Sequence, residues 1–244
     1  MAEYNTRIRS AATQDVAIDA GLRAYMLRVY NYMLLGLALT GGTAYLTATT
    51  PLGAAFYNIQ NGYIVGMSPL GWIALFAPLA MVFFLGFRIA HMSLAAAQTT
   101  FWVYAGLMGI SLTPILFMYT GASVAQVFFI TAATFGAMSL YGYTTGRDLS
   151  SFGSFLFMGL IGLLIASLVN MFLQSSMMQW VISVIGVLIF TGLTAYDTQR
   201  IKESYYVGDD GTLAGKKAVM GALSLYLDFV NLFLMLIRLM GDRR

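Results

Sequence analysis

No cysteine occurs among the 244 residues, which excludes disulfide bonds and thiolate metal sites. The chain has one histidine, His91, and a single imidazole cannot form a zinc site by itself. Charged residues make up only 9% of the sequence, whereas a soluble domain carries roughly 25% because its surface must be hydrated. No basic cluster is interleaved with aromatic residues, so we expect no nucleic-acid partner. Most of the protein surface must therefore face something other than water.

Long apolar runs take the place of the missing charge, and hydrophobic residues make up 59% of the chain. A helix needs about 20 mainly apolar residues to cross a bilayer. Seven segments have roughly this character: Val29–Thr49, Leu70–Phe87, Leu94–Tyr119, Ala122–Thr144, Phe152–Leu173, Met177–Tyr196 and Ala218–Met240. These runs are continuous, whereas the strands of a membrane barrel would alternate. The sequence therefore predicts an all-α polytopic membrane helix bundle with seven transmembrane helices, and the lipid bilayer as its surroundings.

The chain divides simply around these runs. We predict a cytoplasmic N-terminal arm over residues 1–27, a seven-helix transmembrane domain over residues 28–241 and a short basic tail over residues 242–244. The N-terminus does not resemble a cleavable signal, because Glu3, Asp15 and Asp19 interrupt it and the first apolar run is too long. We therefore expect an uncleaved first helix and no sizeable soluble domain.

Basic residues mark alternate links between the predicted helices. The N-terminal arm and the second, fourth and sixth links carry Lys or Arg, whereas the first, third and fifth links carry none. Because cytoplasmic loops are enriched in these residues, the pattern predicts a cytoplasmic N-terminus. Arg238 lies near the end of the last run, and Arg243 and Arg244 follow it, where an odd number of spans places them outside. We predict that the last run spans fully despite this charge.

Two acids, Asp197 and Asp228, lie inside apolar runs. A charged side chain at mid-bilayer costs on the order of 2.5–3.5 kcal/mol and usually faces a bundle interior or a wet cavity. Ser224, Asp228 and Asn231 are spaced four and three residues apart, which puts them on one helical face. This polar stripe is a candidate lining for a pore or a proton relay. The alternative is a structural Asp228 that is hydrogen-bonded to a neighbouring helix.

The two acids belong to consecutive, antiparallel helices, so we expect their carboxyl groups to lie within hydrogen-bonding reach. Two carboxyl groups in a low-dielectric site cannot both ionise easily, and they would share a proton and titrate as a pair. Asp197 also has an alternative interpretation as a solvated ion pair with Arg200 near a helix end. Arg88, at the end of the second predicted helix, is a candidate counter-charge or an ordinary cytoplasmic anchor.

Three segments resemble the bacterial branch of the Bax inhibitor-1 family, also called the transmembrane Bax inhibitor motif family. They are Tyr30-Asn-Tyr-Met-Leu-Leu-Gly-Leu37, Ala195-Tyr-Asp-Thr-Gln-Arg-Ile201 and Ala222-Leu-Ser-Leu-Tyr-Leu-Asp-Phe-Val-Asn-Leu-Phe233. The resemblance implies a seven-helix fold of the bacterial inner (plasma) membrane, with helix seven central. It also implies a di-aspartyl pH sensor at Asp197 and Asp228, onto which Arg88 latches, and a pH-sensitive calcium leak.

Three functions are compatible with these residues. The first is a pH-sensitive calcium (cation) leak channel gated by the aspartyl pair. The second is a membrane-embedded regulatory partner of membrane proteases or stress-response complexes, with no transport activity. The third is an intramembrane aspartyl protease, but Leu225-Tyr-Leu227 stands where that class has a Gly-x-Gly lead-in. We expect no enzymatic activity and no cofactor, and two carboxylates are too few for a tight calcium site.

The charge pattern generates a topology prediction. Alkaline phosphatase fused after Arg244 should be active, because seven spans from a cytoplasmic N-terminus end in the periplasm. The same reporter fused after Arg147, in the fourth link, should be inactive and serves as the control. A C-terminal fusion that is active only with a cytoplasmic reporter would contradict the seven-span arrangement and indicate a re-entrant last segment.

Overall fold

The computed structural model describes residues 2–60 and 63–244, with side chains from Ala20 onward. The side chains of the predicted arm residues Glu3, Arg7, Arg9, Asp15 and Asp19 lie outside this description. The helices and strands, in chain order, are α1 (Ala2–Thr49), α2 (Gly53–Phe56), β1 (Tyr57–Gln60), β2 (Tyr63–Met67), α3 (Pro69–Arg88), η1 (Ile89–His91), α4 (Leu94–Met118), α5 (Gly121–Thr144), α6 (Ser150–Leu173), α7 (Ser176–Glu203) and α8 (Gly211–Met240).

Six helices are long and apolar enough to cross a membrane: α3, α4, α5, α6, α7 and α8. They correspond to the second through seventh predicted runs. The first predicted run, Val29–Thr49, forms the second half of α1, which is not among the six. The prediction of an all-α membrane bundle is therefore confirmed, and the count of seven spans stays a prediction.

Small polar residues set where several of these helices begin. Each accepts a hydrogen bond from the backbone N–H three residues later, which satisfies a donor that the first turn leaves unpaired. These residues are Ser68 before α3, Ser93 before α4, Thr120 before α5 and Ser175 before α7. The helices therefore start at the breaks in the apolar pattern, where the sequence placed them.

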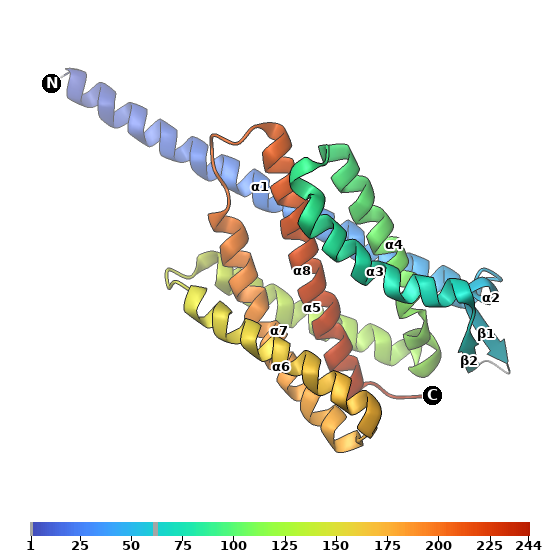
Figure 1. Ribbon diagram of the computed structural model, residues 1–244. Helices are drawn as coiled ribbons and strands as arrows, with labels where there is room; N and C mark the ends of the chain where they lie inside the picture. Colours follow the sequence, from blue (N-terminus) through green and yellow to red (C-terminus); the bar gives the residue numbers. More distant parts are fainter. Residues whose placement is uncertain (1, 61–62) are drawn as a thin grey trace.

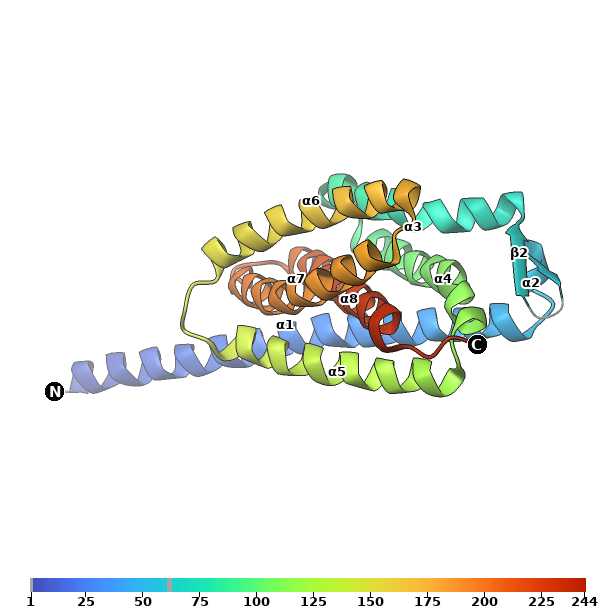
Figure 2. The same ribbon diagram turned by 90° about the horizontal axis from the view of Figure 1, so that it is seen from below.

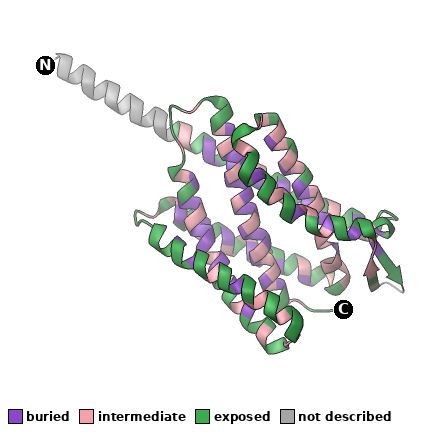
Figure 3. Ribbon diagram, viewed as in Figure 1, coloured by how far each residue is buried: buried purple, intermediate pink, exposed green. Residues whose placement is uncertain are grey.

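The last helix, α8, is the core of the bundle. It packs against α1, α4, α5 and α7, and Figures 1 and 2 show it enclosed by them. Of its most apolar stretch, 61% is buried, compared with 11% for α6, which packs chiefly against α7. Figure 3 shows this contrast as a purple α8 beside a largely green α6. The outer helices therefore shield α8 and present their own apolar side chains to lipid.

A short antiparallel strand pair between α2 and α3 departs from the helical pattern. Tyr57 pairs with Met67 and Gln60 pairs with Tyr63 across β1 and β2. The side chain of Tyr57 is buried, and its hydroxyl donates to the Ile110 carbonyl of α4 at 2.6 Å. The prediction of an all-α fold did not include this strand pair. The alternation of Tyr, Ile and Val on either side of an Asn-Gly pair is in fact a hairpin signal.

Two predicted helix ends were wrong by about two turns. α7 continues past Tyr196 to Glu203, because the buried Gln199 side chain binds the α5–α6 link: its amide donates to the Arg147 carbonyl and its carbonyl accepts from the Leu149 N–H, both at 2.8 Å. α8 begins at Gly211 rather than Ala218, because the Asp210 carboxylate accepts from the Leu213 N–H at 2.6 Å. Hydropathy alone stopped the prediction of α7 before Asp197 and started that of α8 after Lys217, so both predicted spans left out the polar residues that hold these helix ends.

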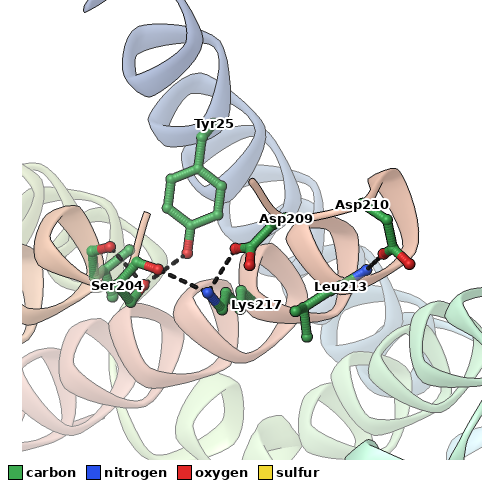
Figure 4. A network of polar contacts seen from close by, with 7 residues as sticks. Tyr25, Ser204, Asp209, Asp210, Leu213 and Lys217 are labelled. Carbon is green, nitrogen blue, oxygen red and sulfur yellow. Dashed lines mark hydrogen bonds and ion pairs between the residues drawn. The ribbon is translucent and has the colours of Figure 1, made fainter. Parts of the chain in front are cut away.

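The link between α7 and α8 is fixed to α1 by a polar network (Figure 4). The Lys217 ammonium pairs with the Asp209 carboxylate at 2.5 Å and donates to the Ser204 carbonyl at 3.0 Å. The Tyr25 hydroxyl of α1 lies 3.1 Å from the Ser204 hydroxyl. This link therefore holds α1, α7 and α8 together at one end of the bundle, called here the α7–α8 end.

The C-terminal tail packs at the opposite end, called here the α6–α7 end. The Thr120 N–H donates to the Asp242 carbonyl at 3.1 Å, and the Arg244 N–H donates to the Met118 carbonyl at 3.0 Å. The Asp242 N–H also donates to the Ser123 hydroxyl at 2.9 Å. The tail is thus held against the α4–α5 link, and α8 runs the full height of the bundle between the two ends.

Candidate functional site

Asp228 is buried in the middle of α8. Its side chain is 5% exposed, and its Oδ2 atom has no hydrogen-bond donor among the described residues. A buried carboxyl oxygen without a donor is costly unless it holds a proton or contacts a proton-bearing group. Its surroundings must therefore supply such a group.

The structure brings Asp197 to this position. Asp197 lies on α7, and its carboxyl group is within hydrogen-bonding range of the Asp228 carboxyl group. Arg200, one turn further along α7, is close enough to act electrostatically on Asp197. The two acids, called here the aspartate pair, therefore meet as the sequence analysis expected, and their role as a pH sensor stays a prediction.

A glycine sets the register that lets these acids meet. A Cβ atom on Gly221 would lie 3.1 Å from the Ile201 Cγ2 atom, so Gly221 of α8 rests directly against Ile201 of α7. From this contact the chain rises four residues along α7 to Asp197 and seven along α8 to Asp228. At 1.5 Å per residue, the two carboxyl-bearing residues differ in height by only about 4–5 Å, which their side chains can bridge.

The aspartate pair lines a cavity of about 560 Å³ between α6, α7 and α8, called here the aspartate cavity. Ser224 and Asn231, the other members of the predicted polar stripe, line the same cavity. The rest of the lining comes from Gly153, Ser154, Phe157, Leu160 and Leu164 of α6, from Phe190, Leu193, Tyr196 and Arg200 of α7, and from Leu227 of α8. All three polar residues predicted on α8 therefore face one space.

An apolar layer closes this cavity toward the α6–α7 end. Leu163 of α6 and Met235 of α8 are both buried, and they meet at Gly186 of α7. A Cβ atom on Gly186 would lie 2.8 Å from the Met235 sulfur atom and 3.5 Å from the Leu163 Cδ2 atom. Leu163, Gly186 and Met235, called here the apolar layer, are therefore closely packed in this conformation.

Arg88 lies elsewhere. It is an exposed residue at the end of α3, which packs chiefly against α4, and it does not line the aspartate cavity. Its proposed role as a latch stays a prediction. Arg200 is the basic residue that the structure places beside the pair, and the sequence analysis had treated it only as a solvated partner of Asp197. Its spacing of three residues from Asp197 was the signal that could have identified it.

The residues that the structure describes do not gather a metal site of several acidic ligands. Among the described residues, no group of three or more His, Asp or Glu side chains is placed to hold a metal ion. Calcium in proteins takes six to eight oxygen ligands. Among the oxygen-bearing side chains of this cavity are those of the aspartate pair, Ser224 and Asn231.

Known proteins resemble this chain along almost its whole length. The family model described as inhibitor of apoptosis-promoting Bax1 matches residues 22–244. A protein of Rickettsia prowazekii is 49% identical over 100% of both chains. The inner membrane protein YbhL of Escherichia coli is 45% identical over 92% of this chain and 94% of its own. A membrane protein of Streptococcus pyogenes is 39% identical over 91% of this chain and 94% of its own.

The geometry predicts that the aspartate cavity is reached by water. Because the natural chain has no cysteine, single-cysteine variants can be labelled without background. Ser224→Cys faces the cavity, whereas Leu225→Cys, one residue along α8, replaces a fully buried side chain. A thiol must ionise to react, so a water-soluble maleimide should label Ser224→Cys at least about tenfold faster than Leu225→Cys. Equal rates would mean that the cavity is dry.

Proposed function

The chain belongs to the Bax inhibitor-1 family, and on this premise we propose that it is a pH-sensitive cation leak of the bacterial inner membrane. Calcium is the proposed ion, and the aspartate pair is the proposed gate. One observation carries the proposal: a buried Asp228 carboxyl group meets Asp197 in a cavity that Ser224 and Asn231 also line. A helix that served only as a scaffold would not need three polar residues on one buried face.

The proposed topology has seven spans, with the Val29–Thr49 part of α1 as the first and α8 as the central seventh. The N-terminus is cytoplasmic, so the α7–α8 end with Lys217 faces the cytoplasm. The basic links on that side support this orientation. The name of the Escherichia coli relative, an inner membrane protein, supports the choice of membrane. The aspartate cavity then lies on the cytoplasmic side of the apolar layer.

Protonation of the aspartate pair is the proposed switch. With one proton between them, the two carboxyl groups can form a short, charge-assisted hydrogen bond that holds α7 against α8. A second proton removes the anionic acceptor, and loss of the only proton sets two like charges against each other. Either change weakens the contact between the helices. Arg200, which lines the same cavity one turn from Asp197, is the positive charge beside the pair and is proposed to tune the switch.

Movement of α6 is the proposed route to opening. α6 packs chiefly against α7, most of its surface faces outward, and it supplies Leu163 to the apolar layer. Displacing it from α8 would separate Leu163 from Met235 and would join the aspartate cavity to the α6–α7 end. A narrow apolar constriction of this kind blocks ions because it does not hold water, and it conducts once it is wide enough to wet.

Calcium flux into liposomes that contain the purified protein tests the gate. Asp197→Asn/Asp228→Asn should flatten the dependence of flux on pH, because neither amide titrates. Glu203→Gln, an exposed change at the end of α7, is the matched control and should keep the dependence. A double variant with the full pH dependence would make the aspartate pair structural. Flux no greater than in empty liposomes at every pH would favour the regulatory-partner function.

The apolar layer generates a second prediction for the same assay. Met235→Ala should raise calcium flux at the pH of least leak, because trimming a packed core methionine destabilises its packing by about 2–5 kcal/mol. Even a barrier lowered by about 1.4 kcal/mol would raise the flux roughly tenfold. Met240→Ala, at the exposed end of α8, is the control and should change nothing. Unchanged flux in Met235→Ala would place the ion path outside the space between α6, α7 and α8, called here the α6–α7–α8 seam.

A further inference from the structure

A second cavity, of about 610 Å³, lies on the same seam beyond the apolar layer, at the α6–α7 end. α6, α7, α8 and the C-terminal tail all contribute to it. Its polar lining includes Ser167, Asn170, Gln174, Gln179, Arg238 and Arg243. None of its lining residues is acidic, so this space, called here the arginine cavity, presents hydrogen-bond donors and positive charge.

The tail holds Arg243 in place for this cavity. The backbone of Arg243 pairs with that of Tyr119 in an isolated bridge, and the hydrogen bonds of Asp242 and Arg244 to the α4–α5 link fix the residues on either side. Arg238 reaches the cavity from the last turn of α8. The fold therefore positions two arginines from different segments together. This lowers the conformational entropy that the protein would lose on binding a ligand.

Neither arginine has a carboxylate partner within the part of the chain whose side chains are described. Among the described residues, the ion pair that forms is Lys217–Asp209, at the opposite end of the bundle. Asp242, the acid next to Arg243 in the chain, does not line the cavity. Guanidinium groups at such a site bind phosphate or carboxylate oxygens through paired N–H donors. The amides of Asn170, Gln174 and Gln179 can add further donors.

The rim of the arginine cavity belongs to the membrane face. The α6–α7 corner exposes large apolar side chains, with Phe172 82% and Met177 76% exposed, and Trp180 both lines the cavity and is 60% exposed. Tryptophan is enriched at the level of lipid head groups. A ligand with an anionic head and apolar chains fits this surface, whereas a free anion would leave the apolar rim bare. We propose that the arginine cavity binds the phosphate head group of an anionic phospholipid.

This assignment accounts for the one feature of the charge pattern that opposes the proposed topology. Arg238 and Arg243 lie on the side of the membrane where lysine and arginine are depleted. Basic pockets between transmembrane helices are a recurrent means of binding anionic lipid head groups. Binding of such a head group would explain why these arginines lie at that surface, and the explanation does not depend on ion flux.

Quenching of Trp180 fluorescence by brominated lipids tests the proposal. The chain has three tryptophans, so Trp72→Phe/Trp102→Phe leaves Trp180 as the single reporter. In vesicles of phosphatidylcholine, brominated phosphatidylglycerol should quench Trp180 at a lower mole fraction than brominated phosphatidylcholine does. In this background, Arg238→Gln/Arg243→Gln should weaken the preference by about 30-fold, the expected effect of two basic residues near a lipid surface.

Two further variants make the result specific. Arg244→Gln removes the same charge from the same tail but does not line the arginine cavity, so the preference should remain. Arg238→Lys/Arg243→Lys keeps both positive charges and should retain most of the preference. This variant therefore shows whether the glutamine variant loses binding through its charge or through misfolding. Equal quenching by the two lipids in the parent would overturn the proposal. So would an equal loss in Arg244→Gln, or displacement of the lipid by excess inorganic phosphate at matched ionic strength, which would indicate a site for free anions.

Discussion

The contact between α7 and α8 at Gly221 is the constraint on which the rest of the site depends. Because Gly221 has no side chain, Ile201 can rest against the α8 backbone, and this fixes the heights at which Asp197 and Asp228 meet. The burial of Asp228 follows from the central place of α8, which α1, α4, α5 and α7 surround. A carboxyl group in this position is acceptable in a membrane protein only beside another polar group that can share its proton.

Under the proposed function, the space between α6, α7 and α8 is one path with unlike ends. The aspartate cavity lies on one side of the apolar layer, and the arginine cavity lies on the other. Two guanidinium groups beside the path oppose the approach of a divalent cation, and a bound lipid phosphate would offset them. The proposed leak and the proposed lipid site are thus compatible, although each is tested by its own measurement.

The two ends of the bundle are held by different means. At the α7–α8 end, Lys217, Asp209 and Ser204 form a polar network with Tyr25 of α1. At the α6–α7 end, backbone hydrogen bonds hold the tail to the α4–α5 link. α6 has its main contact with α7 alone. The anchored helices therefore form a frame, and α6, the least buried of the six apolar helices, lies outside it.

The sequence by itself determined the class of protein, the approximate spans and the two acids, because each depends on local composition: long apolar runs require lipid, and an acid within such a run requires a polar interior. It did not determine the ends of α7 and α8, which Gln199 and Asp210 set through their hydrogen bonds. The three-residue spacing already put Arg200 near Asp197, but only the tertiary structure left Arg88 outside the aspartate cavity and gathered Arg238 and Arg243 into one cavity. Apolar helices in lipid carry no local signal for which neighbour they choose, since packing and close approach at residues such as Gly186 and Gly221 decide it.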